Sequence, residues 1–148
     1  LEKETYEKWL KLKQEVSERG YNIDIESAYR TYEYQQKVLD EITAEKGVDY
    51  ASKAVAMPGH SEHQTGLALD YCIFRASEVI IEYDMDALEE TVFTNNIAHK
   101  YGFILRYPKG KEMITGYNYE PWHLRYVGEE LAAYLYENKL TLDEYYRK

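Results

Sequence analysis

The sequence has little of several residue types and patterns that particular protein classes require. Its single cysteine, Cys72, excludes an internal disulfide and leaves the redox compartment open. It contains no run of 18 apolar residues, so we expect no segment of it to span a bilayer. The sequence has 18 Lys and Arg residues and 27 Asp and Glu residues, which gives a net charge of −9. This charge argues against binding to nucleic acids and against a basic surface that binds membranes. The helical HExxH signature of many zinc peptidases is also missing.

The 148 residues are enough for one domain with a hydrophobic core, and 45% of them are hydrophobic. No repeat, low-complexity tract or linker interrupts them, so we predict a single domain over residues 1–148. Seventeen are tyrosines, whose apolar ring and polar tip suit half-buried surfaces and clefts. Because the sequence starts at Leu1 without an initiator methionine, we expect that a preceding signal or anchor segment has been removed.

Hydrophobic periodicity predicts five helices, over residues 2–19, 31–46, 86–101, 129–138 and 141–148. The stripes expected to face the core are Tyr6, Trp9, Leu10 and Val16 in the first helix, and Tyr34, Val38, Leu39 and Ile42 in the second. Two pairs, Asp86 with Glu89 and Thr141 with Glu144, have the spacing of a capping box and predict where two of the helices begin.

Apolar or alternating stretches predict strands over residues 21–27, 67–74, 103–108 and 122–127, whereas residues 77–85 are ambiguous. Residues 48–66 and 109–118 are expected to be loops. Strands and helices are mixed without regular alternation. The predicted fold class is therefore α+β, with a small, mainly antiparallel sheet and flanking helices.

The stretch GHSEHQTGLALD, residues 59–70, places several ionisable side chains beside an apolar strand. Asp70 ends that apolar run, and a carboxylate there is costly unless it is paired or bound to a metal. His63 lies in the loop that leads into the strand, and Gly66 lets this loop fold back toward it. An imidazole and a carboxylate brought together in this way suit a divalent ion, with zinc favoured by the imidazole.

A second stretch, EPWHLRYVG at residues 120–128, offers a further imidazole and carboxylate. His123 lies on one face of a predicted strand, and Glu120 comes just before it. Two histidines and an aspartate make a three-ligand site with an open fourth position, as catalytic zinc sites have. Glu120, near the metal but not bound to it, would be the general base for a water molecule there.

Each of these residues also has a structural interpretation. His63 is equally explained as a hydrogen-bonded structural histidine, Asp70 as a turn former and Glu120 as a solvated loop residue. The residues taken singly leave both interpretations open.

The stretches taken together resemble a known family. SEHQTGLALD at 61–70 fits the pattern S-x-H-x-x-G-x-A-x-D, and EPWH at 120–123 fits E-x-W-H. With SAYRTYEYQ at 27–35 and the segment 102–128, in this order, they resemble the VanY-type D-alanyl-D-alanine carboxypeptidases. This family of bacterial zinc peptidases also contains the LdcB-type L,D-carboxypeptidases. The resemblance covers residues 20–130 and departs from the pattern at Ala28, where glycine is usual.

The resemblance implies the hedgehog/D-Ala-D-Ala peptidase-like fold and removal of the C-terminal D-alanine from peptidoglycan stem peptides. It implies an extracytoplasmic, envelope-associated protein in preference to a cytoplasmic one, and we expect a monomer. The implied site consists of the ligands of one Zn²⁺ per chain, His63, Asp70 and His123; the base Glu120; Arg30, which polarises the scissile carbonyl and stabilises the oxyanion; Ser61 and Gln36, which contact the substrate; and Tyr107 and Trp122, which line the cleft.

Other functions stay open at this point. An L,D-carboxypeptidase that trims the tetrapeptide shares every motif quoted above, and a D-Ala-D-Ala dipeptidase is less favoured. A non-catalytic zinc-containing module that binds cell-wall peptides has no need of the pair Glu120 and Arg30. A closed structural site would need a fourth ligand, for which His60, His99 and Cys72 remain; His60 is expected in a loop and His99 on a solvent-facing helix surface. Residues 75–90 match no motif.

Overall fold

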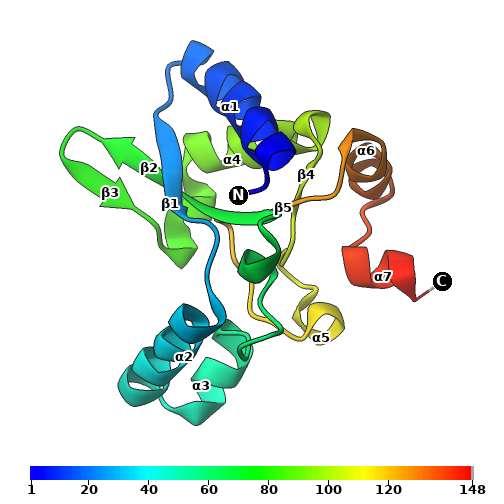
Figure 1. Ribbon diagram of the computed structural model, residues 1–148. Coiled ribbons are helices and arrows are strands. Elements are labelled where there is room, and N and C mark those ends of the chain that lie inside the picture. Colours follow the sequence, from blue (N-terminus) through cyan, green and yellow to red (C-terminus); the bar gives the residue numbers. More distant parts are fainter. Residues whose placement is uncertain (148) are drawn as a thin grey trace.

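The computed structural model describes residues 1–147, and Figure 1 shows helices packed around one twisted sheet. In chain order the elements are α1 (Lys3–Glu18), β1 (Ile23–Ser27), α2 (Tyr32–Lys46), α3 (Val48–Ala54), β2 (Ala68–Arg75), β3 (Glu78–Ile80), α4 (Glu89–Ile97), β4 (Phe103–Leu105), α5 (Glu112–Thr115), β5 (His123–Tyr126), α6 (Glu129–Asn138) and α7 (Leu142–Tyr146). Short 3₁₀ helices span Glu62–Thr65, Tyr83–Ala87 and Ala98–Tyr101. The predicted α+β class is confirmed.

The sheet is antiparallel at every pairing between its strands, in the order β1-β2-β5-β4, with β3 added beside the far end of β2. β2 is therefore the central strand. Its third residue, Asp70, is the direct partner of Ser27 on one side and of His123 on the other. The four strands predicted from the sequence are confirmed as β1, β2, β4 and β5. The ambiguous residues 77–85 form β3 and the beginning of a 3₁₀ turn.

The hydrophobic core lies between the sheet and the helices α1 and α4 (Figure 1). Alternate residues of β2, namely Leu69, Tyr71 and Ile73, enter this core, so that Asp70 points to the opposite face. From α1 the core receives Trp9, Leu12 and Val16, which recur at three- and four-residue spacing. The expected stripe was wrong at Tyr6 and Leu10, which are nearly half exposed, because the buried face of α1 runs through Leu12 instead.

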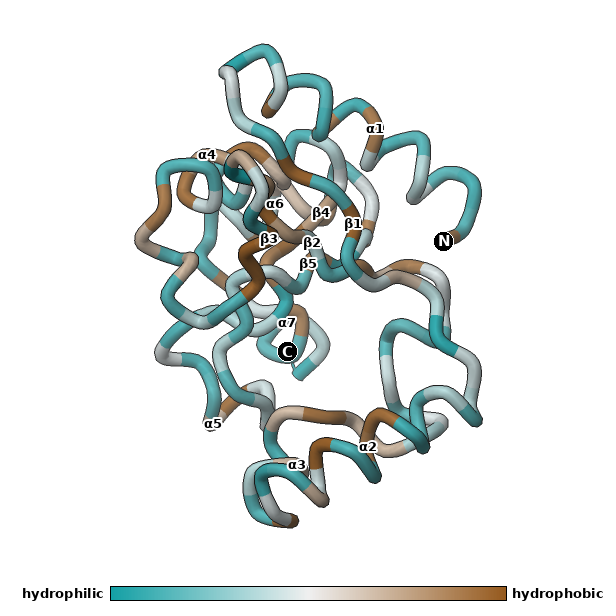
Figure 2. The backbone as a smooth tube through the Cα atoms, turned by 90° about the vertical axis from the view of Figure 1, so that its left-hand side faces the viewer, coloured by the Kyte–Doolittle hydropathy of each residue, from teal (hydrophilic) through white to brown (hydrophobic). Residues whose placement is uncertain are grey.

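The pair α2 and α3 lies apart from the rest, on the side of the sheet away from α1 (Figures 1 and 2). Gln35 is the buried residue of α2, whereas Tyr34 of the expected stripe is exposed. Residues 48–54, expected to be loop, are helical, and Ala51 of α3 is buried. This pair therefore forms a separate wall facing the sheet and contributes little to the main core.

The two predicted capping pairs had different outcomes. Thr141 and Glu144 form a capping box at the start of α7, as expected. Asp86 and Glu89 do not, because α4 begins at Glu89 and has Leu88 as an N-cap without a side-chain hydrogen bond. Residues Tyr83–Ala87 form a 3₁₀ turn of their own, in which Met85 is buried in the core. Asp86 belongs to this turn and therefore lies outside α4.

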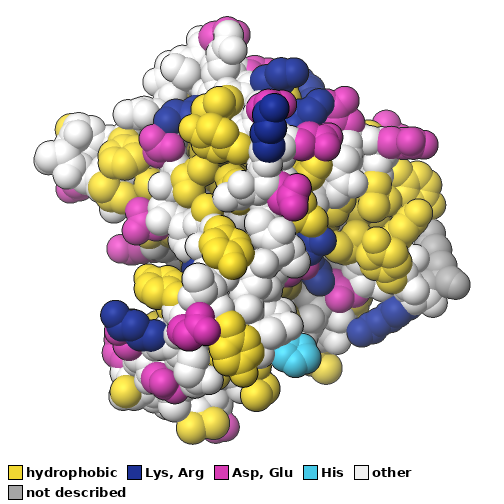
Figure 3. All heavy atoms as spheres, in the orientation of Figure 1, with side chains coloured by type: hydrophobic (Ala, Val, Ile, Leu, Met, Phe, Trp, Pro, Cys, Tyr) yellow, Lys and Arg dark blue, Asp and Glu magenta, His cyan; other side chains and the backbone are white. Residues whose placement is uncertain are grey.

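The surface is mixed in character. On the face shown in Figure 3, basic side chains occur in small separate groups among acidic and hydrophobic ones. Within residues 1–147, none of the helices combines the length and the apolar character needed to cross a bilayer.

Gly102, at the start of β4, provides a test of this packing. Its φ is +83°, and an added Cβ would lie 2.5 Å from Cε2 of Tyr126 and 3.0 Å from the carbonyl carbon of Gly128. We predict that Gly102→Ala lowers the free energy of unfolding by about 2–4 kcal/mol, from backbone strain plus overpacking. Gly110 has a similar φ of +82° with no atom within 4 Å of such a Cβ, so Gly110→Ala should cost only about 1 kcal/mol. Equal losses in urea denaturation of the two variants would contradict the packing described.

Candidate metal centre

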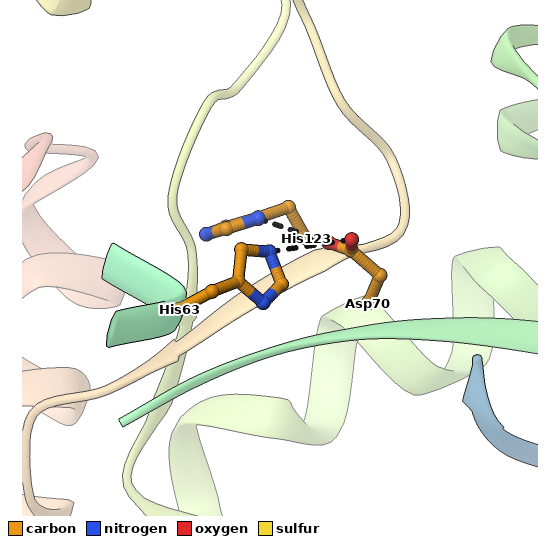
Figure 4. Close-up of side chains that lie close together, drawn as sticks. All are labelled: His63, Asp70 and His123. Atoms are coloured by element: carbon orange, nitrogen blue, oxygen red, sulfur yellow. Dashed lines mark hydrogen bonds and ion pairs between the residues drawn. The ribbon is translucent and has the colours of Figure 1, made fainter. Parts of the chain in front are cut away.

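Three side chains from separate parts of the chain meet at one buried point: His63, Asp70 and His123 (Figure 4). His63 belongs to the 3₁₀ turn before β2, Asp70 to β2 and His123 to the start of β5. Directly opposed residues of antiparallel strands have side chains on the same face, so the pairing of Asp70 with His123 brings these two together. Gly66, with φ +74°, allows the sharp change of direction between the 3₁₀ turn and β2. One ligand atom from each residue lies within 4.8 Å of the others.

Asp70 lies between the two imidazoles. Its Oδ2 is 3.3 Å from Nε2 of His63, and its Oδ1 is 3.0 Å from Nδ1 of His123. On the other side of the His63 ring, Nδ1 donates to the carbonyl of Ala28 at 2.6 Å, so the lone pair of Nε2 is left facing Asp70. Two imidazole nitrogens and one carboxylate oxygen suit zinc, and three protein ligands leave its fourth position open. These residues therefore fit a divalent metal site of the catalytic type.

The charges at this point also favour a cation. Burial opposes the negative charge of Asp70, but the hydrogen bond from His123, together with the neighbouring ring of His63, holds the pKa of that carboxyl well below its usual range. Burial likewise opposes a charge on His123, yet the interactions with Asp70 and Glu62 and the negative charges of Asp70 and Glu120 outweigh it and raise the His123 pKa to about 10. A proton on His123 compensates the buried carboxylates, and a divalent cation would provide the same compensation and displace that proton.

Glu120 lies beside the three-residue group. Its Oε2 is 3.6 Å from Nδ1 of His123, and its backbone N–H donates to the carbonyl of Tyr107 at 3.1 Å. Burial raises the pKa of Glu120 to about 7; the positive charges of His123 and Arg30 oppose this effect, and the negative charges of Asp70 and Glu62 add to it. A carboxyl group poised near neutral pH can both accept and donate a proton, which is what a general base and acid requires.

Arg30 and Ser61 lie on the same side of the sheet as Asp70. Arg30 Nη2 donates to Oδ2 of Asp70 at 2.9 Å, and its Nε donates to Oγ of Ser27 at 3.0 Å. The backbone N–H of Arg30 donates to the carbonyl of His63 at 3.2 Å. Ser61 is buried and lines the cleft. The structure thus places a fixed positive charge and a hydroxyl next to the metal-ligating group.

A cleft of about 260 Å³ opens onto these residues, between the sheet and the α2–α3 pair. Tyr107 and Trp122 are among the residues that line it. The segment 75–90, which matched no motif, contributes Tyr83. The hydroxyl of Tyr83 lies 3.0 Å from that of Tyr50 on α3, and its ring packs against Trp122 with centroids 5.0 Å apart. The segment 75–90, which the sequence left unassigned, and α3, which was expected to be loop, therefore meet at the cleft.

Gln36 does not lie in this cleft, contrary to its expected contact with substrate. It is exposed and donates to Asp40, one helical turn further along α2, at 2.8 Å. Its neighbour Gln35 lines the cleft together with Val38 and Ile42, at the i, i+3, i+7 spacing of one helix face. Gln35 Nε2 donates to the carbonyl of Ala56 at 2.8 Å, while its buried Oε1 has no hydrogen-bond partner. Gln35 therefore belongs to the wall of the cleft, and its side chain is fixed to the backbone at Ala56.

Glu62 is a residue of this region to which the sequence gave no role. It is largely buried, and Oε1 accepts from Arg106 Nε at 2.7 Å and from Arg125 Nη1 at 2.9 Å. Its Oε2 lies 3.5 Å from Nε2 of His123. The only sequence signal was its position directly before His63.

The remaining candidates for a fourth ligand lie elsewhere. His60 is exposed in a turn, as expected. His99 was expected to face solvent, but it is half-buried and stacks on Tyr136 with ring centroids 3.8 Å apart. Cys72 is buried, and its Sγ contacts the carbonyl of Asp24 at 3.5 Å. Within residues 1–147, the metal-ligating group that includes Asp70 has three members.

Comparison with known proteins gives a consistent result. The family model described as VanY, D-alanyl-D-alanine carboxypeptidase, matches residues 1–129. The putative carboxypeptidase YodJ of Bacillus subtilis (strain 168) is 44% identical over 133 residues, which cover 90% of this chain and 48% of YodJ. The chain thus spans about half the length of that relative.

Two solved structures extend the similarity to the fold. That of the LdcB LD-carboxypeptidase has a TM-score of 0.91 and 41% identity, covering 100% of this chain and 69% of LdcB. A second is the E175A mutant of the D,D-pentapeptidase VanY from a VanB-type resistance cassette, in complex with Zn(II). It has a TM-score of 0.85 and 36% identity, covering 96% of this chain and 81% of that one.

The raised pKa of Glu120 gives a prediction for the metal-free protein. Above pH 7 the folded protein holds a buried carboxylate that the unfolded chain would expose to water, so this group disfavours folding there. We predict that Glu120→Gln raises the free energy of unfolding at pH 8, with a chelator present, by about 1–3 kcal/mol. The gain should fall as the pH drops through 7 and vanish below the ordinary value of 4.5, where both states are protonated. Denaturant titrations at pH 4 and 8 that give the same difference between variant and parent would contradict this.

Proposed function

Because the chain belongs to the VanY family of D-alanyl-D-alanine carboxypeptidases, we propose that it is a zinc-dependent enzyme that removes the C-terminal D-alanine from peptidoglycan stem peptides. The observation that carries this proposal is the buried group His63, Asp70 and His123, with the carboxyl group of Glu120 3.6 Å from Nδ1 of His123. A similar VanY structure contains Zn(II), which supports zinc as the ion held by the three ligands here, one per chain.

In this proposal each residue near the cleft has a defined task. When bound, zinc supplies a Lewis acid that polarises the scissile carbonyl and makes water more acidic. Glu120 takes a proton from the attacking water, whose oxygen bonds to the carbonyl carbon. The C–N bond then breaks, and Glu120 gives the proton to the amine of the departing D-alanine. A general base of this kind contributes about 10²–10⁴-fold in rate.

Arg30 stabilises the negative charge that develops on the carbonyl oxygen. Its guanidinium cannot lose its proton in a protein, and it lies 2.9 Å from Asp70, next to the metal ligands. Ser61 binds the C-terminal end of the substrate, and Gln35, in place of its neighbour Gln36, contributes to the wall of the cleft. Tyr107 and Trp122 form apolar walls of the cleft.

The proposed substrate also bears on where the protein acts. Assembled peptidoglycan lies outside the membrane, and we propose that this chain acts there, at the cell envelope. We expect residues 1–148 to act as one domain and as a monomer, since the ligands, base and arginine all come from a single chain.

A second candidate is an L,D-carboxypeptidase that trims the tetrapeptide. The specific observation in its favour is the high structural similarity to the LdcB LD-carboxypeptidase over the whole chain. The two activities need the same metal ligands and base, and they differ in the configuration of the residue before the scissile bond. The wall formed by Tyr50, Tyr83 and Trp122 is where such a difference would be read.

A non-catalytic peptide-binding module is disfavoured by Glu120. A buried carboxyl group costs stability above pH 7, and a protein that only binds peptide gains nothing from it. In a hydrolase the same group is required in the reaction, which explains why it is kept beside the ligands.

Two substitutions separate metal binding from catalysis. His63→Ala removes one of three ligands, so we predict that the zinc content falls well below one ion per chain. Glu120→Gln keeps all three ligands, so we predict full zinc content and a turnover number lower by about 10²–10⁴-fold. Elemental analysis and a D-alanine release assay measure both properties. Stoichiometric zinc in His63→Ala, or an unchanged turnover number in Glu120→Gln, would count against the assigned roles.

The substrate class is tested by product masses. We predict that a pentapeptide ending in D-Ala-D-Ala loses one alanine and that a tetrapeptide ending in a single D-alanine is trimmed more slowly. Mass spectrometry of both digests, each with the zinc-loaded parent protein and with Glu120→Gln as the inactive control, gives the answer. Trimming of the tetrapeptide alone would replace the main proposal by the L,D-carboxypeptidase. Absence of both products would favour a binding module.

A further inference from the structure

A buried carboxylate lies on the side of the His123 ring that faces away from Asp70. Oε2 of Glu62 is 3.5 Å from Nε2 of His123, whereas Nδ1 of the same ring is 3.0 Å from Oδ1 of Asp70. Both Nε2 of His123 and Oε2 of Glu62 are buried, and neither has a hydrogen-bond partner. A donor and an acceptor of this kind, facing each other, are complementary when Nε2 carries the ring proton.

This arrangement matters because an imidazole that binds a metal through one nitrogen keeps its proton on the other. For His123 the nitrogen on the side of Asp70 and His63 is Nδ1, so the proton must lie on Nε2. We infer that Glu62 is a positioning residue, which accepts the Nε2 proton of His123 and so holds Nδ1 toward the metal. The inference rests on the proposed zinc site.

Glu62 is itself held in place by two arginines. Arg106 Nε and Arg125 Nη1 both donate to its Oε1, at 2.7 and 2.9 Å, which leaves Oε2 for His123. Arg106 also donates through Nη1 to Oδ2 of Asp143 in α7 at 2.5 Å. The two carboxylates, of Glu62 and Asp143, balance the two guanidinium groups, of Arg106 and Arg125. The carboxylate of Glu62 can therefore be buried without an excess of charge.

The other histidine ligand, His63, is held in a corresponding way by a backbone carbonyl. Nδ1 of His63 donates to the carbonyl of Ala28 at 2.6 Å, which directs its Nε2 to the metal point. The 3₁₀ turn Glu62–Thr65 therefore supplies the ligand His63 and also Glu62, the residue that positions His123. Loss of such an outer partner typically weakens metal binding by about 10–100-fold.

The matched variants are Glu62→Gln and Asp143→Asn. Each removes one negative charge next to Arg106 at nearly constant volume, but only Glu62 faces His123. In Glu62→Gln the amide oxygen faces the two arginines, so its NH₂ group faces Nε2 and favours the wrong tautomer of His123. We expect Zn²⁺ affinity, measured by competition with a chelator on the full chain, to fall by about 10–100-fold in Glu62→Gln. In Asp143→Asn it should stay within about threefold of the parent.

A spectroscopic measurement separates positioning from a purely structural role. In the zinc-loaded parent, the Nε2 proton of His123 should resonate far downfield because it is bonded to a carboxylate. That resonance should move upfield in Glu62→Gln at saturating zinc and stay in place in Asp143→Asn.

The outcomes are distinct. A folded Glu62→Gln variant with parent-like zinc affinity and an unmoved resonance would overturn the inference and leave the proposed function intact. A parent protein that binds no zinc overturns the proposed function, and the inference with it. Equal weakening in both variants would assign Glu62 to the stability of the fold and also overturn the inference.

Discussion

The site depends on the register between β2 and β5. This pairing places Asp70 directly opposite His123, and the alternation of side chains along β2 sends Asp70 away from the core that Leu69 and Tyr71 enter. A shift of one residue would turn the carboxylate into the core and separate it from both imidazoles. The contacts of Asp70 with both imidazoles and with Arg30 therefore depend on one set of main-chain hydrogen bonds.

Much of this could be predicted from the sequence, because local patterns carry the information. The spacing of Trp9 and Val16 predicts α1, and the Thr141–Glu144 pair predicts the start of α7. The set His63, Asp70 and His123 was expected because residues 61–70 and 120–123 resemble the motifs of a known family, and the structure brings these three side chains together. Alternation along a strand is enough to place Asp70 on the face opposite the apolar residues.

The rest depends on tertiary packing that no local pattern contains. Gln35 and Gln36 differ only in which face of α2 meets the cleft, and this is decided by where α2 packs against α3. Burial of Met85 overrides the capping pair of Asp86 and Glu89. Glu62 acquires a partner in His123 only when residues 61 apart in the chain are brought together by the β2–β5 pairing.

The central claim is that three protein side chains hold one ion and leave room for solvent. The most direct measurement is an anomalous-difference map, recorded at the zinc edge, of crystals grown with zinc. We expect one peak about 2.0–2.2 Å from Nε2 of His63, Nδ1 of His123 and a carboxylate oxygen of Asp70, with a solvent molecule as fourth neighbour. A peak at another place, or an ion enclosed by four protein ligands, would contradict the account.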